Sequence, residues 1–347
     1  MNERDLKIDY ARATAVLMML LQHVCIFLHA DNIRVTYTSA IIIESVIMIT
    51  KSAVPLFVII TGSVLLDSRR EFPYQKGLKY AFRMIKIIVF WNIVNAFYFF
   101  LNDGLKAGIG KLIYGNYWYL YMLVGLYLLM PIVNLLIKDY KETKIPVYVI
   151  VLTLVYELWL SYSLLIPESI YGYASKFVGK FMFSLITGYS GFLLLGYVVK
   201  KDYSSLNFRS KKAIAIEVII GSLMIVLLIY AVIMAVKNND YNHIYFDEFT
   251  AFTIGGIIFC LFQKQRTSEI MGGGRLKFRK ILLFIGTHSL GIYVVSNIIL
   301  DVYKRNMLAI EAFPFTLLGM LVCWLMLIIP SCLIVYIVSK TSLKWII

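Results

Sequence analysis

Charged residues are scarce in this chain: Asp, Glu, Lys and Arg together make up only 16% of its 347 positions. A soluble domain usually holds about 25% of these residues, so the shortage argues against a water-soluble fold. Long polar stretches are also missing. The longest lie around residues 67–80 and 264–280, and an independent soluble domain needs about 50 residues or more. The sequence therefore predicts one integral-membrane domain over residues 1–347.

Cysteine is rare, and no cysteine has an obvious disulfide or ligand partner nearby in the sequence. The four residues, Cys25, Cys260, Cys323 and Cys332, lie in apolar segments without a CxxC pair or a His-rich neighbour. Buried thiols usually act as small hydrophobic side chains. We therefore predict no metal site, no disulfide and no bound cofactor.

Hydrophobic residues supply 60% of the chain and give it a mean hydropathy of +0.78. They gather in long runs such as IIGSLMIVLLIYAVIMAV at 219–236, and a run of about 18 apolar residues or more is typical of a membrane span. The runs do not alternate between polar and apolar positions, which excludes an outer-membrane barrel. We expect an all-α fold, a polytopic transmembrane helical bundle of about ten spans.

The expected spans follow the apolar runs, and their boundaries are accurate to a few residues. Proline removes a backbone hydrogen bond and clashes with the preceding helical turn. The long second span should therefore break around Pro55, either as a bent helix or as two half-spans. The ten expected ranges are 10–29, 39–66, 81–101, 117–137, 145–166, 178–199, 213–236, 247–263, 281–301 and 313–339.

Lys and Arg are distributed unevenly between the loops on the two sides of these spans. With the N-terminus inside, 25 of the 34 Lys and Arg lie on the cytoplasmic side, which is the bias that cytoplasmic loops show. We therefore expect both termini in the cytoplasm and no cleavable signal peptide, since the first apolar run has no A-x-A site. The same bias accounts for the formal net charge of +14. We expect contact with membrane lipid and none with nucleic acid.

Two ionisable residues, Arg12 and His23, lie eleven positions apart on the first expected span. At about 100° per residue they project from one helix face, roughly 16 Å apart along the axis. Ionisable groups inside a membrane are costly and usually face the protein interior or a wet cavity. Two interpretations stay open from periodicity alone. In one, Arg12 binds an anion and His23 is a general base; in the other, Arg12 snorkels to the membrane edge and one hydrogen bond satisfies His23.

Other charged residues are candidates for lining the same site. Asp9 is three residues before Arg12 and can pair with it on one helix face. Glu44 and Lys51 are seven residues apart on the second span, too far for direct contact without bending, and Glu157 stands alone on the fifth. Charges in lipid need partners, which other helices would supply.

Trp118 and His288 each have a structural alternative. Trp118 stands in the tyrosine-rich segment 117–121, which is typical of an interfacial aromatic belt, and a site-lining role is the second interpretation. His288 lies in GTHSLGIY, near the cytoplasmic start of the ninth span. A capping or loop role competes there with a catalytic one.

Several motifs occur in an order that resembles acyltransferase family 3, the membrane acyltransferases that modify surface polysaccharides, lipopolysaccharide and peptidoglycan. The span from Arg12 to His23 is similar to that family's Arg-x10-His signature. Further similar segments cover nearly the whole chain: SAVPLFVIITGSVLL (52–66), FRMIKIIVFW (82–91), YWYLYMLVGLYLLMP (117–131), GFLLLGYVVKK (191–201) and SLGIY (289–293).

This resemblance implies roles for individual residues. His23 would be the catalytic base, and Arg12 would contact the acyl donor. Arg83 and Lys86 match the family's basic stretch and would bind the phosphates of coenzyme A.

Three positions depart from the family's pattern. Thr61 precedes Gly62 where the family usually has Ser, and Val89 stands where a proline often follows the basic stretch. Ser296 replaces the His that commonly follows the GIY segment, with Asn297 next. The last change leaves the role of a second histidine open.

The sequence therefore predicts a membrane-bound O-acyltransferase in the cell membrane. It would move an acetyl or other short acyl group, such as succinyl, from cytoplasmic acyl-CoA to a hydroxyl of an extracytoplasmic cell-surface glycan. Acyl-CoA would be a co-substrate, and a transient acyl-histidine intermediate stays open. The alternative is an exporter of a glycan or lipid-linked intermediate, which would also use intramembrane charges. Against the exporter, the sequence shows no paired repeat of the kind common in transporters.

Overall fold

The computed structural model contains helices and no strand over the residues it describes, which confirms the predicted all-α class. Most of the seventh expected span, 213–236, and part of the sixth, 178–199, lie outside the described residues. The described residues are 5–30, 37–115, 117–138, 143–162, 173, 176–181, 187–202, 226, 229–230, 232–234, 236–237, 248–264, 276–306 and 317–347.

In this described part, five helical segments are long and apolar enough to cross a membrane, or six if α15 and α16 form one bent span. These lengths and compositions are those of a helical membrane protein. The helices and their bounds are α1 (Leu6–Ala30), α2 (Tyr37–Thr50), α3 (Ala53–Leu65), α4 (Tyr74–Asp103), α5 (Leu105–Tyr114), α6 (Trp118–Leu136), α8 (Ile145–Tyr162), α10 (Tyr189–Asp202), α13 (Glu248–Lys264), α15 (Leu276–Thr287), α16 (Ser289–Asn306), α17 (Leu317–Ser339) and the 3-10 helix η4 (Ser342–Ile346).

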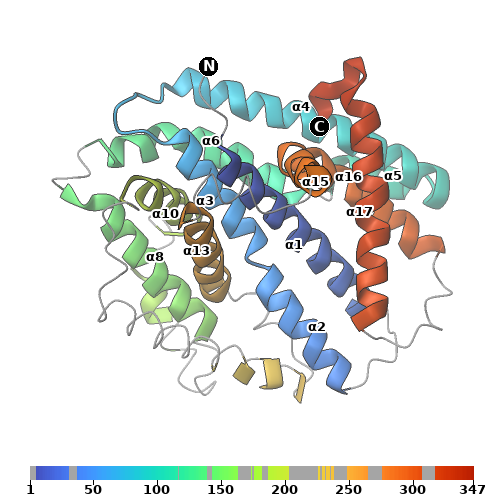
Figure 1. Ribbon diagram of the computed structural model, residues 1–347, viewed down its shortest axis with the longest axis horizontal. Helices are drawn as coiled ribbons and strands as arrows, with labels where there is room; N and C mark the ends of the chain where they lie inside the picture. The colour runs from blue at the N-terminus through green and yellow to red at the C-terminus, as the bar shows by residue number, and fades with distance from the viewer. Residues whose placement is uncertain are drawn as a thin grey trace.

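Helix α1 crosses the middle of the bundle, with α2 and α3 on one side and α17 on the other (Figure 1). Its small residues Ala11, Ala13 and Ala15 are buried, and small side chains let membrane helices approach closely. Gly286 of α15 lies directly against it, because a Cβ there would stand 2.0 Å from the carbonyl oxygen of Asp9. The helix that carries Arg12 and His23 is therefore surrounded by protein.

The second expected span is broken, as predicted, but at Lys51–Ser52 instead of at Pro55. Helix α2 ends at Thr50 and α3 begins at Ala53, so Pro55 lies in the first turn of α3. Proline is tolerated there because the first N–H groups of a helix have no partner within it. The break therefore precedes the proline, and the two half-helices together keep the length of one span.

Helices α3 and α10 approach each other through two glycines. A Cβ on Gly62 would stand 2.0 Å from the carbonyl oxygen of Leu193, and one on Gly196 would stand 1.9 Å from that of Ile59. Any larger residue would push the two helices apart. Gly62 belongs to the segment 52–66, so close helix packing is the physical reason for a glycine in that motif.

Two further expected boundaries were wrong. Helix α4 begins at Tyr74 rather than at residue 81, because the Lys and Arg of this stretch occupy an exposed helix face instead of a loop. Residues 105–114, which were expected as part of a loop, form α5, where Gly108 packs closely against Ala96 of α4.

The ninth expected span is also two helices, α15 and α16, which are bent by 81° at His288. Nδ1 of His288 lies 3.1 Å from the carbonyl oxygen of Phe284, and the two rings stack at 4.4 Å between centroids. An imidazole that bonds a carbonyl in the last turn caps a helix C-terminus. The structure therefore favours the capping alternative for His288.

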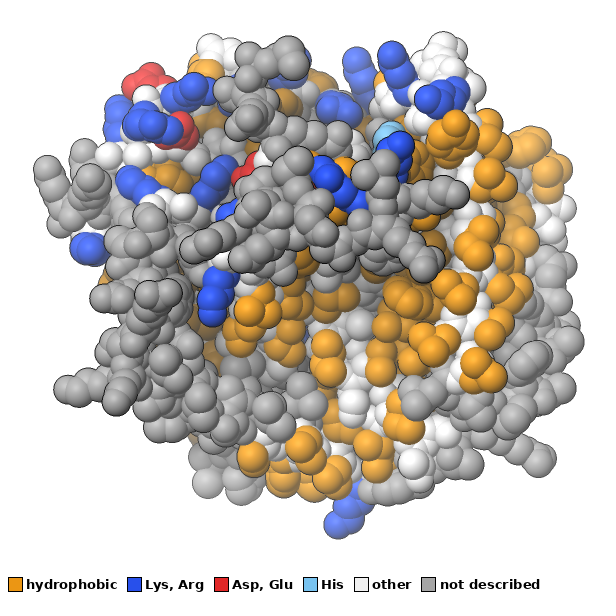
Figure 2. Space-filling model, viewed as in Figure 1, with side chains coloured by type: hydrophobic (Ala, Val, Ile, Leu, Met, Phe, Trp, Pro, Cys, Tyr) orange, Lys and Arg blue, Asp and Glu red, His pale blue; other side chains and the backbone are white. Residues whose placement is uncertain are grey.

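Lys and Arg side chains gather along the upper edge of the molecule, above a broad hydrophobic face (Figure 2). In the same view, the start of α1 and the C-terminus lie on this upper side (Figure 1). Exposed apolar side chains of α17, such as Leu325, Ile329 and Leu333, belong to the hydrophobic surface. A basic rim beside an apolar belt is typical of a helical membrane protein.

Candidate active site

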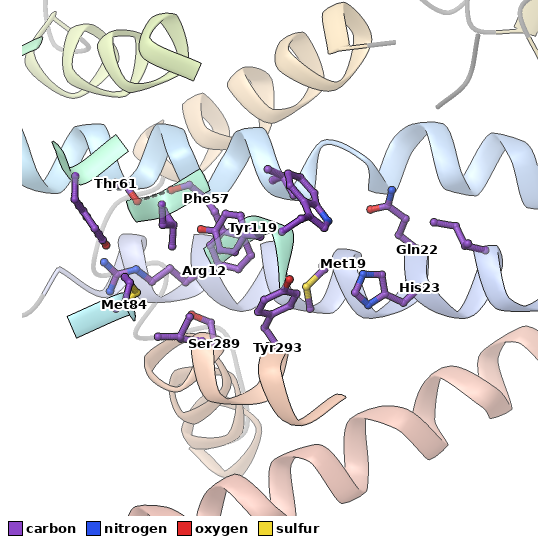
Figure 3. A pocket seen from close by; sticks show the side chains of 16 residues that line it. Arg12, Met19, Gln22, His23, Phe57, Thr61, Met84, Tyr119, Ser289 and Tyr293 are labelled. Atoms are coloured by element: carbon purple, nitrogen blue, oxygen red, sulfur yellow. Dashed lines mark hydrogen bonds between the residues drawn. The ribbon is translucent and has the colours of Figure 1, made fainter. Parts of the chain in front are cut away.

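One cavity inside the bundle is lined by both Arg12 and His23 (Figure 3). It has a volume of about 240 Å³ and lies among α1, α3, α4, α6 and α16. In Figure 3 the two side chains project from α1 at opposite ends of the cavity, with Tyr119 and Tyr293 between them. The shared helix face that the spacing predicts therefore turns towards a cavity inside the protein.

Helix α6 runs along the cavity in the direction opposite to α1. Trp118 at its start and Tyr127 nine residues later both line the cavity, about 14 Å apart along the helix axis. Met84 of α4 lies beside Arg12 (Figure 3), and Gly77, two turns earlier on α4, packs against the backbone of Tyr127, so Tyr127 marks the Arg12 end. The start of α6, with Trp118, is thereby placed towards His23.

The Arg12 end of the cavity is polar and partly open. The Arg12 side chain is 35% exposed, and its Nη1 lies 3.9 Å from Oδ1 of the buried Asp9. A guanidinium has five N–H donors, so this single long contact leaves donors for an anion. Ser289, the first residue of α16, lines the same end (Figure 3). The positive end of that helix dipole therefore adds to the guanidinium charge.

The lining at the His23 end carries no charged side chain. Nδ1 of His23 is buried, and no described residue forms a hydrogen bond with it. The ring of Tyr293 lies 6.4 Å from the imidazole, centroid to centroid. Gln22 stands beside His23 in the lining (Figure 3). The alternative in which one hydrogen bond within the protein satisfies His23 is therefore not realised in the described part of the chain.

Ser296, at the position of the family's common second histidine, contributes nothing to the cavity lining. Its side chain is fully buried, and its hydroxyl donates to the carbonyl oxygen of Tyr293 over 2.8 Å. The amide of Asn297 donates to the same oxygen over 3.1 Å. Both side chains thus bond within their own helix, and neither of them lines the cavity.

Arg83 and Lys86 lie outside the cavity. Both are exposed on α4, three residues apart and so on one face, whereas Met84 between them lines the cavity. Arg83 lies within electrostatic range of Tyr127, as Arg12 does. The predicted basic stretch is therefore placed beside the Arg12 end, on the outer surface.

Three other candidates lie apart from the cavity. Glu44 is buried on α2, Glu157 is buried on α8, and Lys51 is half-buried at the break between α2 and α3. None of these three belongs to the cavity lining, while Trp118 does. Within the described residues, no group of three His, Cys, Asp or Glu side chains is arranged to hold a metal ion.

Several lining residues have no strong signal of their own in the sequence. Gln22, Tyr119 and Tyr293 line the cavity, but uncharged side chains cost less in a membrane than charged ones. The free-energy cost of a charge in the membrane identifies Arg12 and His23, but it does not identify these three uncharged residues. The available signal is position, since Gln22 precedes His23 and the two tyrosines lie in segments 117–131 and 289–293.

Comparison with known protein families decides the enzyme class. The family model described as an acyltransferase domain matches residues 5–339, nearly the whole chain. The chain belongs to acyltransferase family 3. Together with the membrane-spanning helices, this membership makes the protein a membrane acyltransferase and gives the exporter alternative no support. No curated protein and no solved structure matches the chain significantly.

The family 3 match includes every element that lines the cavity. Helices α1, α3, α4, α6 and α16 all fall between residues 5 and 339. The cavity therefore belongs to the acyltransferase domain itself, which makes it the candidate active site of this family 3 enzyme.

Proposed function

We propose that this acyltransferase moves an acetyl or other short acyl group from cytoplasmic acyl-CoA to a hydroxyl of an extracytoplasmic cell-surface glycan. The protein is a single domain that spans the cell membrane about ten times, with both termini in the cytoplasm. Acyl-CoA is a co-substrate and not a bound cofactor. The partners are membrane lipid, acyl-CoA and the acceptor glycan.

The observation that carries this proposal is one cavity with Arg12 at one end and His23 at the other. A cytoplasmic donor and an external acceptor meet only if a passage through the protein joins them. The roughly 16 Å between the two residues along α1 is about half of a hydrocarbon core of about 30 Å. A thioester on an extended arm could therefore reach His23 while the rest of the donor stays outside.

The Arg12 end suits the phosphates of coenzyme A. A guanidinium binds phosphate with paired, charge-assisted hydrogen bonds, and the start of α16 at Ser289 favours an anion at the same place. Arg83 and Lys86, exposed on α4 beside this end, add positive charge where the nucleotide would lie. In this arrangement the nucleotide stays at the surface, and only the acyl-bearing arm enters the cavity.

The His23 end suits general-base catalysis. Because Nδ1 is buried, Nε2 is the nitrogen that takes the proton, as a neutral imidazole can. It accepts the proton of the acceptor hydroxyl while that oxygen bonds to the carbonyl carbon of the thioester. The carbon–sulfur bond then breaks, and the proton passes from the imidazolium to the leaving thiolate. The products are an ester on the glycan and free coenzyme A with a thiol.

The surface charge supports the proposed orientation. The upper edge in Figure 2 is rich in Lys and Arg, and cytoplasmic surfaces of membrane proteins carry such an excess. The start of α1, six residues before Arg12, lies on this side (Figure 1). The donor end then faces the cytoplasm, and the His23 end faces the acceptor.

The test is transfer by the purified, full-length protein in lipid vesicles. The protein is incubated with acetyl-CoA carrying a radiolabelled acetyl group and with a crude cell-envelope glycan fraction. We expect label on the glycan that mild base releases, because oxygen esters are base-labile. Movement of unmodified glycan into the vesicles without ester formation would contradict the proposal and support export.

A further inference from the structure

Three aromatic residues stand side by side at the start of α6, and they have different environments. Tyr117 is fully buried, where its hydroxyl accepts a hydrogen bond of 2.7 Å from Asn95. Tyr119 is 9% exposed and packs edge-on against Tyr293 at 5.6 Å between ring centroids. Trp118 between them is 54% exposed, yet it still lines the cavity. Only the middle ring of the three thus reaches both the cavity and the outside.

The indole N–H of Trp118 also differs from those of two other tryptophans. Trp91 donates its indole N–H to the carbonyl oxygen of Ile346 over 2.9 Å, and Trp324 donates to that of Leu17 over 3.1 Å. Among the described residues, no acceptor is in place for Trp118. Buried or structural indoles usually find such a partner. Trp118 therefore keeps both a ring face and a donor for something outside the protein.

Gln22 is the second group at this end with unused polar atoms. Its side chain is half-buried and lines the cavity next to His23 (Figure 3). No hydrogen bond within the described residues involves its carboxamide, which has an acceptor oxygen and two N–H donors. A partly buried amide loses stability unless a partner satisfies it, and a bound substrate would be such a partner.

We propose that Trp118 and Gln22 form the acceptor subsite, which holds a sugar ring of the glycan against His23. A pyranose presents C–H groups on one face and hydroxyls around its edge. The C–H face suits the negative face of an indole ring, and neighbouring hydroxyls suit the donor and acceptor atoms of one carboxamide. This inference rests on the proposed function, and it adds the residues that would position the reacting hydroxyl.

An interfacial belt is the competing explanation for an exposed tryptophan. A belt residue faces lipid headgroups and has no need of a cavity, whereas Trp118 shares the cavity lining with His23 and Gln22. A belt role also leaves the amide of Gln22 unexplained. The two explanations predict different responses to sugar, which makes them separable by experiment.

The first test is binding without turnover. Intrinsic tryptophan fluorescence of the full-length protein in vesicles of fixed composition is titrated with oligosaccharides released by mild acid from the cell envelope. We expect a saturable change that Trp118→Phe abolishes and Trp345→Phe retains. Trp345 is the matched control, because it is 46% exposed but belongs to η4 and packs on Phe90. A change that survives Trp118→Phe, or the absence of any change in the wild type, would overturn the proposal.

The second test uses steady-state transfer to the same oligosaccharides. We expect Trp118→Leu and Gln22→Leu each to raise the acceptor KM about tenfold, as the loss of one stacking or hydrogen-bonding contact would, with the donor KM within twofold. Trp118→Phe keeps a ring and should lose less than Trp118→Leu. An acceptor KM within twofold of wild type in Trp118→Leu, or equal rises in both KM values, would contradict the subsite.

The two tests also separate this inference from the proposed function. If the wild type transferred no acyl group but its fluorescence still changed with oligosaccharide through Trp118, the catalytic proposal would fail and the sugar subsite would stand. If transfer occurred but Trp118 had no influence on the acceptor, the subsite alone would fail.

Discussion

The two ends of the cavity differ in the charge of the side chains that line them. At the Arg12 end, a partly exposed guanidinium, the nearby Asp9 carboxylate and the start of α16 at Ser289 create a charged surface. At the His23 end, the lining is uncharged, and the ring of Tyr293 lies 6.4 Å from the imidazole, centroid to centroid. Charge at a water-facing mouth attracts and anchors an anion over a distance, whereas a neutral pocket selects by shape and hydrogen bonding. In the proposed function, the charged end binds the anionic donor and the neutral end carries out the transfer.

The largest expected effect comes from removing His23, the proposed base at the neutral end. His23→Ala removes the imidazole from the cavity lining, so the rate of acyl transfer should fall about 10²–10⁴-fold if that ring is the general base. Binding of coenzyme A at the other end should change less than twofold. The measurements are single-turnover transfer of labelled acetyl groups and calorimetric binding of coenzyme A.

The matched control for this variant is His288→Gln. His288 is also half-buried, but it caps α15 through the Phe284 carbonyl oxygen and lies outside the cavity lining. Glutamine keeps a donor for that carbonyl, so transfer should stay within about threefold of wild type. Rapid transfer by His23→Ala would show that His23 is not the general base. The two ends of the cavity would then no longer have the separate roles of donor binding and catalysis.

The next effect belongs to the charged end. Arg12→Gln keeps a polar side chain but removes the charge, and a hydrogen bond to a charged group is worth about 1.5–3 kcal/mol. The affinity for coenzyme A should therefore fall about 10–150-fold, and the loss should shrink as salt screens the wild-type interaction. Calorimetry at two salt concentrations measures both quantities.

The acceptor KM is the internal control for Arg12→Gln, because Trp118 and Gln22 lie at the other end of the cavity. An acceptor KM that rises as much as the donor KM would show that the ends are not independent. Unchanged donor affinity would remove the docking role of Arg12.

Arg12 and His23, which line the cavity, were predicted from the sequence, whereas most of the other lining residues were not. Arg12 and His23 were found because charge is costly in a membrane and because helical geometry fixes where positions eleven apart point. Gln22 and Tyr293 were missed because an uncharged side chain in a membrane helix looks alike whether it faces lipid, protein or a cavity. The packing of the neighbouring helices decides which of these surroundings a side chain faces, and this packing cannot be read directly from a single sequence.

The same limit explains the errors in the fold. The break in the second span was foreseen because proline has a local effect, although helix α2 ends at Thr50, five residues before Pro55. The 81° bend at His288 was not foreseen, since no proline marks it. Gly286 had no local signal either, because its role is contact with α1.

Gly286 allows the packing of the charged end to be tested separately. Because a Cβ at Gly286 would stand 2.0 Å from the Asp9 carbonyl oxygen, Gly286→Val should push α15 away from α1 and cost about 1–3 kcal/mol. The melting temperature in detergent should fall, and the donor KM should rise about threefold to tenfold through the displaced Asp9–Arg12 turn. Gly125→Val is the control, since a Cβ at Gly125 has no heavy atom within 4 Å. A variant with normal stability and donor KM would show that this close contact does not position Arg12.

The smallest effect is expected at Ser296, where the family commonly has a second histidine. The Ser296 hydroxyl already donates to the Tyr293 carbonyl within its own helix, and that carbonyl also accepts from Asn297. Removing the hydroxyl in Ser296→Ala should leave no buried donor unsatisfied, so both the transfer rate and the two KM values should stay within about twofold of wild type. Steady-state kinetics in which each substrate is varied at a saturating concentration of the other measure the rate and both KM values. A rate loss of tenfold or more would mean that the hydroxyl reaches the reacting groups, and His23 would then not be the sole proton carrier at the neutral end.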